Sequence, residues 1–235
     1  MRAVERARLN SLLDDRFEVD PLTLAGRLCS LCAATTGVSG VALVVVGKLN
    51  RSTVCASDAV SAELEDLAFT CAEGPSVEVS RCGGAVLVAD LVMESPSRWP
   101  WFAPAAVRAG ARAMFAFPVY LGGCLIGVLV LYRATPGGLT TEEVRDTWTM
   151  AEAASVLLST QESVSAGVRG SAWVVGDRSR FRARVHQAVG VTMDDLHLNA
   201  VDALALVAAH VFVTGEPIGV VAERILTQNL RLERA

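Results

Sequence analysis

The sequence predicts an α+β domain followed by a small all-helical domain, and three observations lead to this fold class. Residues 115–133, FAFPVYLGGCLIGVLVLYR, hold two apolar runs on either side of a Gly-Gly pair, as in a β-hairpin. Segments 20–37 and 140–163 each begin with a helix N-cap signal. From Val185 onward the composition becomes helical.

The hairpin is expected to form the centre of the sheet. Gly122-Gly123 tolerates the positive φ angles of a tight turn. Alternation in the first run predicts a strand with one apolar face made of Phe115, Phe117, Val119 and Leu121. The second run, Cys124–Tyr132, is apolar almost without a break, which is typical of a strand covered on both faces. Pro118 lacks an amide donor and is therefore expected at a bulge or an edge.

The remaining elements of this domain are predicted from capping residues, apolar spacing and turn residues. In chain order they are a helix over 20–37 with Ala25, Leu28, Cys29 and Cys32 on one face, strands at Val41–Val46 and Thr53–Ala56, a helix capped by Ser57 or Asp58, a strand at Ala85–Val88, a loop from Glu94 to Pro104, the hairpin, and a helix to about Ser163. In that last helix Thr140 and Glu143 have capping-box spacing.

Composition narrows the class of protein. The chain has 235 residues, of which 52% are hydrophobic and 20% charged, as expected for a globular protein with one large or two modest domains. No apolar segment reaches the roughly 20 residues of a membrane helix, and residues 1–20 lack a secretory core. Six cysteines without a secretory signal are typical of reduced thiols, so a cytoplasmic location is expected.

Charge is distributed unevenly along the chain. Residues 169–235 hold eight arginines against seven acidic residues, whereas residues 1–168 hold thirteen basic and eighteen acidic residues. Between Arg169 and Arg184 five arginines accompany only Asp177. An acidic body with a basic segment before the last domain indicates a polyanionic partner.

Several short motifs carry a resemblance to the GAF family, and specifically to the GAF half of actinobacterial GAF–ANTAR regulators. They are Ala56-Ser57-Asp58, Glu73-Gly74-Pro75, Arg98-Trp99-Pro100, Phe115–Pro118 and Gly127–Arg133. The resemblance implies a sensor domain over 20–163, after an N-terminal segment 1–19. It also implies a signal-sensing pocket between the sheet and a cap made of the 58–69 helix and the 94–110 loop. A mostly apolar lining is expected from Trp99, Trp101, Phe102, Phe115 and Phe117, although these aromatic residues would equally fill an ordinary core.

The C-terminal segment resembles an ANTAR domain, a three-helix RNA-binding module, over 181–235 after a linker at 164–180. Asn199 and Asp202 have capping-box spacing before a helix over Ala200–Val213, and Gly215 and Pro217 separate it from a last helix. The motifs that carry the resemblance are Gln187-Ala188-Val189-Gly190, Asp202-Ala203-Leu204, His210-Val211-Phe212, Gly215, Pro217 and Val221-Ala222. The chain departs from the usual family pattern at Val189, Val207, Ala208 and Val211.

The resemblance implies recognition of RNA hairpins through phosphate and base contacts. The expected contact residues are Arg180, Arg182, Arg184, His186, Gln187, Arg224, Gln228 and Arg231. The implied protein is a dimeric, cytoplasmic regulator of transcription antitermination that binds nascent mRNA hairpins and responds to a ligand or partner at the GAF domain.

Neither an enzyme nor a cofactor is expected, because the hydrolase, zinc-protease and P-loop patterns GxSxG, HExxH and GxxxxGK[ST] do not occur. Three dispersed histidines and a single CxxC argue against zinc. Two alternatives remain. One is a GAF interaction or dimerisation module with a degenerate tail, and the other is a thiol-dependent free methionine sulfoxide reductase using Cys71, Cys82 and Cys124.

Overall fold

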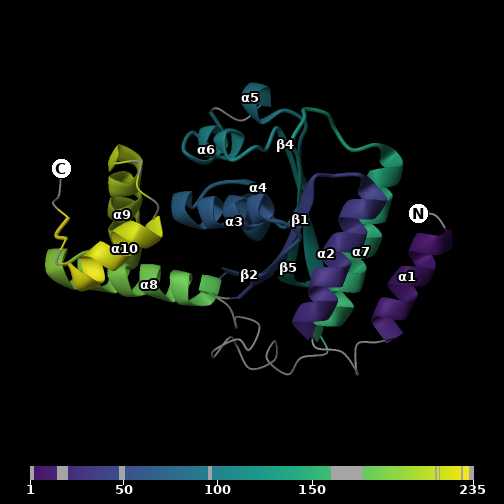
Figure 1. Cartoon of the computed structure of the whole chain (residues 1–235), viewed down its shortest axis with the longest axis horizontal. Helices are drawn as coiled ribbons and strands as arrows, with labels where there is room; N and C mark the ends of the chain where they lie inside the picture. The colour runs from purple at the N-terminus through teal and green to yellow at the C-terminus, as the bar shows by residue number, and fades with distance from the viewer. Residues whose placement is uncertain are drawn as a thin grey trace. The chain divides into compact units, whose positions relative to one another are not determined.

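The computed structural model describes residues 3–14, 21–47, 51–94, 97–159, 177–214, 216, 218–228 and 230–232. The chain divides into two compact units, Met1–Trp173 and Val174–Ala235. The first unit is a β-sheet with helices on both faces, and the second consists of helices (Figure 1). This arrangement confirms the α+β class of the first unit and the helical class of the second.

The sheet is five-stranded and antiparallel in the described part of the chain. Its strands lie in the order β2-β1-β5-β4-β3, with bounds β1 Gly40–Val46, β2 Arg51–Ala56, β3 Val86–Val88, β4 Ala113–Leu121 and β5 Cys124–Arg133. The continuous apolar run therefore forms the central strand, as its composition predicts. Strands β2 and β3 form the two edges.

The β4–β5 hairpin has the predicted turn. Gly122 and Gly123 have φ angles of +56° and +82°, which residues with a Cβ adopt at a cost. Strand β3 pairs with only Met114–Ala116 of β4, so Pro118 lies beyond that pairing and beside the register shift at Val119/Tyr120. Proline thus occupies a position where β4 has no neighbour on that side.

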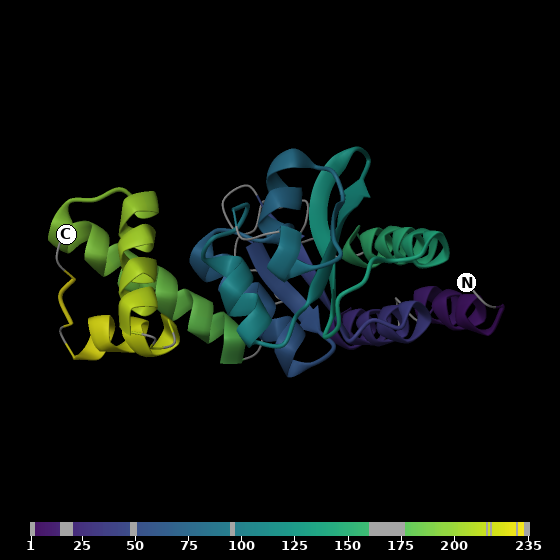
Figure 2. The same ribbon diagram turned by 90° about the horizontal axis from the view of Figure 1, so that it is seen from above.

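Helices α2 (Pro21–Thr36) and α7 (Thr141–Ser159) lie side by side on one face of the sheet, and α1 (Ala3–Asp14) packs on their outer side (Figures 1 and 2). The predicted stripe of α2 is buried in full: Ala25, Leu28, Cys29 and Cys32 are each at most 1% exposed. Helix α1 was not predicted; it buries Leu9 and Leu12 and packs against α2 and α7.

The predicted capping box starts α7. The Thr140 amide donates to Glu143 Oε2 at 2.6 Å, and the Glu143 amide donates to Thr140 Oγ1 at 3.3 Å. Arg133 at the end of β5 donates to Glu143 Oε1 at 2.7 Å and ties the start of α7 to the central strand. The predicted end of this helix, residues 160–163, lies outside the described residues.

Helices α3 (Ala59–Cys71), α4 (Pro75–Cys82) and α6 (Phe102–Arg108) cover the other face, and the short α5 (Leu91–Glu94) precedes α6 (Figure 1). Asp58 caps α3 by accepting the Ser61 amide at 2.8 Å, as predicted. The prediction of a structureless segment over 94–110 is wrong, because α6 lies within it. Helix α4 was also not predicted from the sequence.

Gly127 lies on β5, where it pairs with Val45 of β1 and Val119 of β4. A Cβ at this position would come within 2.7 Å of the Val44 carbonyl oxygen and 3.2 Å of Leu158 Cδ1. We expect Gly127→Ala to lower the free energy of unfolding by about 1–3 kcal/mol, because backbone on one side and α7 on the other must shift. Urea unfolding measures this loss. Gly26→Ala on α2, where a Cβ meets nothing within 4 Å, is the control and should not destabilise the protein.

The second unit contains α8 (Asp177–Leu196), α9 (Ala200–Thr214) and α10 (Ile218–Thr227). Helix α8 packs against both α9 and α10, and α9 also contacts α10. Asn199 caps the start of α9, as the spacing predicts: the Asp202 amide donates to Asn199 Oδ1 at 2.9 Å. The second bond joins the two side chains, with Asn199 Nδ2 donating to Asp202 Oδ2 at 2.8 Å. Helix α8 begins inside the predicted linker 164–180, whereas Gly215 and Pro217 lie outside the described residues.

Candidate functional site

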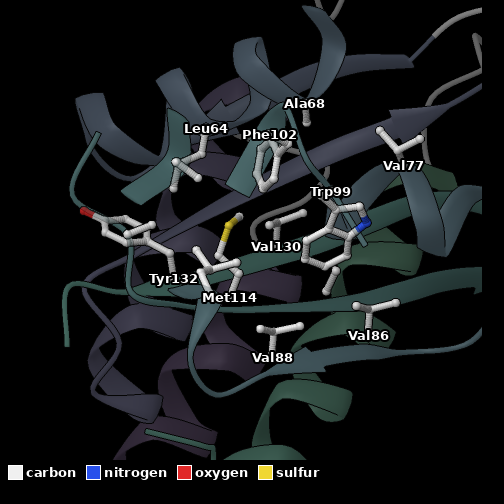
Figure 3. Close-up of a cluster of buried hydrophobic side chains, with 14 of the residues drawn as sticks. Leu64, Ala68, Val77, Val86, Val88, Trp99, Phe102, Met114, Val130 and Tyr132 are labelled. Atoms are coloured by element: carbon white, nitrogen blue, oxygen red, sulfur yellow. The ribbon is translucent and has the colours of Figure 1, made fainter. Parts of the chain in front are cut away.

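The space between the sheet and helices α3, α4 and α6 holds a buried cluster, called here the cap cluster. Its members include Leu64, Ala68, Val77, Val86, Val88, Trp99, Phe102, Met114, Val130 and Tyr132 (Figure 3). Trp99 and Phe102 meet edge to face, with ring centroids 6.0 Å apart, and are 4% and 0% exposed. These two residues therefore lie where the sequence predicts the sensor pocket.

The other three predicted pocket residues are not part of this cluster. Phe115 and Phe117 are buried on the opposite face of β4. There the ring centroid of Phe117 lies 5.3 Å from that of Trp148 on α7. Successive side chains of a strand alternate between faces, so Met114 and Ala116 face the cap instead. Trp101 is 50% exposed. Of the five aromatic residues predicted to share one pocket, the structure therefore brings only Trp99 and Phe102 together in the cap cluster.

Glu73 and Gly74 connect α4 to the start of α6. Glu73 Oε2 accepts the amides of Trp101 and Phe102 at 3.0 and 3.1 Å, satisfying donors at the N-terminus of α6. Gly74 has φ +108°, and a Cβ there would meet the Phe102 ring at 3.1 Å. The Glu73-Gly74-Pro75 motif thus holds α6 and its buried Phe102 over the sheet. Sequence analysis could not assign this role, because the partners lie almost thirty residues away.

Arg98 strengthens the same connection from the loop before α6. It forms an ion pair with Glu78 of α4, and its guanidinium lies 4.8 Å from the centroid of the Trp99 ring. The hydrogen-bonded ion pair with Glu78 raises the pKa of Arg98, and it outweighs partial burial, which acts in the opposite direction. Arg98 therefore stays charged while it covers one side of the buried indole.

A buried polar pair lies between α3 and α4, and sequence analysis did not single it out. Ser76 Oγ donates to Glu65 Oε2 at 2.9 Å, and the two residues are 0% and 1% exposed. Both occur in helix-forming segments without a recognisable motif, so no local signal marks them. A carboxylate here gives the otherwise apolar cap a polar group.

Tyr132 and Asp58 form the polar border of the cap cluster. The Tyr132 hydroxyl donates to Asp58 Oδ1 at 3.3 Å, while Ser61 and Ser57 donate to Asp58 Oδ2 at 2.8 and 3.0 Å. Burial opposes ionisation of Asp58, but hydrogen bonds from Ser61, Ser57 and Tyr132 outweigh it and lower the pKa of this carboxyl. Burial, and then the Asp58 charge, raise the pKa of Tyr132 to about 12.

This pair predicts an alkaline loss of stability. The pKa of Tyr132 is about 12 in the folded chain and about 10 in an unfolded chain. The unfolded chain therefore releases the phenol proton first, so the stabilisation is complete below pH 10 and falls as the pH rises toward 12. Tyr132→Phe should flatten the decline of the melting temperature in this window. Tyr120→Phe is the control and should keep the wild-type slope; equal slopes for all three proteins would contradict the assignment.

The cysteines proposed for a reductase do not form a thiol cluster. Cys71 is half-buried and sits on α3, whereas Cys82 and Cys124 are exposed at the ends of α4 and the hairpin. Burial, and then Glu73, raise the pKa of Cys71 to about 11, which disfavours the reactive thiolate. Among the described residues the sulfur–sulfur contact is elsewhere, between Cys29 and Cys55. In the same part of the chain, no group of three or more His, Cys, Asp or Glu side chains is placed to hold a metal ion.

The core of the second unit contains many residues of the ANTAR-like motifs. Its buried side chains include Val185, Ala188, Val189, Thr192, Ala203, Val207, Ile218, Val221, Ala222 and Ile225. Val189 and Val207, two of the departures from the family pattern, thus fill the core, whereas Ala208 and Val211 are half-buried. On α9, Phe212 and Val213 are 59% and 82% exposed.

Three of the predicted RNA-contacting arginines form ion pairs within the second unit. Arg184 Nη1 of α8 lies 2.5 Å from Glu223 Oε2 of α10, and Arg224 Nη1 lies 2.6 Å from Glu216 Oε2. Arg231 pairs with Asp195. These pairs are partly or largely open to solvent, where such contacts typically contribute less than about 1 kcal/mol each. A phosphate can therefore compete for the arginines.

The remaining predicted contacts lie on α8 and just after α10. His186, Gln187 and Gln228 are exposed. Arg180 and Arg182 lie on α8, where the structure describes the backbone but not these two side chains. Because α8 is helical from Asp177, positions 180, 184 and 187 share one face, and positions 178 and 182 share another. The predicted contacts therefore do not form one continuous row.

No single helix in the described part of the chain is long and apolar enough to cross a membrane. Asp202–Thr214 and Ile218–Thr227 reach the length and composition of a span only when taken together, and the chain bends by 114° between them.

Comparison with known proteins assigns the first unit. Two solved structures with the same fold are the GAF domain of a phosphoenolpyruvate-protein phosphotransferase from Acinetobacter (13% identity, 71% of this chain and 99% of that chain, TM-score 0.53) and the GAF domain of a phosphoenolpyruvate-protein phosphotransferase from Coxiella burnetii (12%, 69% and 96%, 0.54). The comparison with curated proteins finds no match. The GAF domain family model matches residues 18–159, more than half of the chain. The chain therefore belongs to the GAF domain family of signal-sensing modules.

Proposed function

We propose that the chain is a signal-responsive, RNA-binding regulator of transcription antitermination and not an enzyme. The GAF domain senses a ligand or partner in the cytoplasm, and the C-terminal unit acts as an ANTAR domain that binds hairpins of nascent mRNA. The observation that carries the proposal is the second unit itself. It packs α8, α9 and α10 around motif residues such as Ala188, Ala203 and Ala222, directly after a GAF domain.

The distribution of charge supports RNA as the partner. Arg180 and Arg184 occupy one face of α8, and Arg184 reaches α10 through Glu223. Gln187 follows on the same face of α8 and is exposed, so it can hydrogen-bond a base edge while the arginines contact phosphates. The basic face thus combines a sequence-independent contact with a sequence-reading one.

Signal transmission in this proposal uses a dimer. Helix α7 leaves Trp148 and Val156 more than a third exposed, about two turns apart, and α9 exposes Phe212 and Val213. A second copy that covers these apolar side chains would bring two C-terminal units together, so that two hairpins of one RNA are bound. The state of the GAF domain then sets how the two units are paired.

The proposal is tested by titrating the full-length chain against a two-hairpin RNA and a scrambled RNA at two salt concentrations. We expect at least a tenfold preference for the hairpins and weaker binding at higher salt, because displaced counterions accompany each phosphate contact. Equal affinity for the two RNAs at low salt would overturn RNA-hairpin recognition.

A second candidate is an interaction module in which the C-terminal unit assembles proteins and no longer binds RNA. Two observations favour it. The described candidate arginines Arg184, Arg224 and Arg231 are each paired with a carboxylate of the same unit, and the exposed end of α9 is apolar. This candidate predicts a stable dimer that binds neither RNA in the titration.

A further inference from the structure

Two cysteines from different elements of the GAF domain meet sulfur to sulfur. Cys29 Sγ on α2 lies 2.7 Å from Cys55 Sγ on β2. Both cysteines are free thiols, and the separation is shorter than the van der Waals contact of two sulfur atoms. A disulfide bond is about 2.05 Å long, so the sulfurs need to approach by well under 1 Å to be joined.

Local structure explains why these side chains meet. Cys29 belongs to the buried stripe of α2, which faces the sheet. Cys55 pairs with Leu43 next to a register shift, since Val44 pairs with Thr53 and Val54 is the extra residue. A β-bulge of this kind changes the direction of the side chains beside it. The irregularity in the edge strand thus lies at the residue that contacts α2.

The two thiols differ in exposure. Cys29 is 0% exposed, whereas Cys55 is half-buried on the edge strand β2. The hydrogen bond with Cys55, together with burial, raises the pKa of Cys29 well above its ordinary value. An oxidant in solution therefore reaches Cys55 first, while Cys29 stays protonated beside it.

We propose that Cys29 and Cys55 form a reversible, peroxide-driven disulfide that links helix α2 to strand β2. The Cys55 thiol releases its proton, its sulfur attacks one oxygen of hydrogen peroxide and the O–O bond breaks. The leaving hydroxide takes up that proton, so Cys55 sulfenic acid and water are formed. The Cys29 sulfur then attacks the Cys55 sulfur, the S–O bond breaks, and a second water leaves with the Cys29 proton. In total two thiols lose two electrons and two protons, and one peroxide becomes two waters. A small thiol in excess reverses the bond by exchange.

This bond would restrain the helical layer of the GAF domain that contains α2 and α7. Helix α2 packs against α7 and also against α1. A covalent link from α2 to the edge strand restrains the helical layer of the GAF domain relative to its sheet. Disulfide formation does not depend on RNA binding, so it is tested separately from the proposed function.

The test uses full-length protein in a Cys82→Ser/Cys124→Ser background, which removes the two exposed thiols that would form bonds between molecules. Reduced protein is treated with hydrogen peroxide, remaining thiols are alkylated, and the intact mass and the digest are analysed. We expect a loss of two hydrogens and two unreactive cysteines, identified by fragmentation as Cys29 and Cys55. The melting temperature should rise by roughly 5–10 °C, because the bond closes a loop in the unfolded chain.

Two further variants identify the pair. Cys55→Ser should abolish the mass loss and the rise in melting temperature, and this half-buried strand position tolerates the change better than buried Cys29. Cys32→Ser, one turn from Cys29 on α2, should retain both effects. A disulfide that persists in Cys55→Ser, or complete alkylation of the peroxide-treated protein, would overturn the proposal.

Discussion

Phe102→Ala is expected to lower the free energy of unfolding by about 3–5 kcal/mol, which is the usual cost of removing a fully buried aromatic side chain. Phe102 is 0% exposed, meets Trp99 edge to face and lies against Gly74. Its removal leaves a cavity beneath α6 that the surrounding helices fill only in part. Urea unfolding followed by tryptophan fluorescence measures the loss, because Trp99, Trp101 and Trp148 all report on the GAF domain.

Trp101→Ala is the matched control for this variant. Trp101 is adjacent in sequence but 50% exposed, and the hydrogen bond from its backbone amide to Glu73 survives the substitution. We expect it to cost less than about 1 kcal/mol. A similar loss in both variants would show that the stability of α6 depends on the whole segment and not on the buried ring.

A rescue experiment tests whether the substitution leaves a cavity. Apolar cavities left by large-to-small substitutions bind small apolar molecules. Benzene should therefore raise the melting temperature of Phe102→Ala while leaving that of the wild type unchanged. An equal response of the two proteins would show that the surrounding helices close over the position of the lost ring.

The features that were predictable from the sequence depend on neighbours in the chain. Gly122-Gly123 specifies its turn through backbone freedom, and the pairs Thr140/Glu143 and Asn199/Asp202 form caps three residues apart. In each case all the residues that form the feature lie within four consecutive positions of the sequence. The order of strands in the central hairpin follows from the same local signals.

What the sequence did not indicate depends on contacts between distant residues. Helix α6 is stabilised by Glu73, and its existence could not be inferred from residues 102–108 alone. Phe115 was assigned to the pocket by its aromatic character, but the face of a strand is decided by the helices that cover it, here α7. The pairing of Arg184 with Glu223 joins residues 39 positions apart, so this ion pair of a predicted RNA contact has no local signal in the sequence.

The double variant Arg180→Ala/Arg184→Ala is expected to weaken binding to the two-hairpin RNA by about 30- to 100-fold. Hydrogen bonds to charged groups contribute about 1.5–3 kcal/mol each, and part of this is offset because Arg184 must first leave Glu223. The slope of log affinity against log salt should become shallower by about two, one for each lost phosphate contact. Titrations at several salt concentrations measure both quantities.

Arg178→Ala/Arg182→Ala removes the same charge from the other face of the same helix and is the control. Arg182 is also among the contacts expected from the sequence, but a helix that presents positions 180, 184 and 187 to one RNA turns position 182 away from it. It should weaken binding only a few-fold, through the overall loss of positive charge. Glu223→Gln acts in the opposite direction, since it releases Arg184 and removes a negative charge beside the RNA, and should strengthen binding several-fold. If both double variants bind equally weakly and Glu223→Gln has no effect, the arginines attract RNA only through non-specific electrostatic attraction. In that case the face formed by positions 180, 184 and 187 does not read the hairpin.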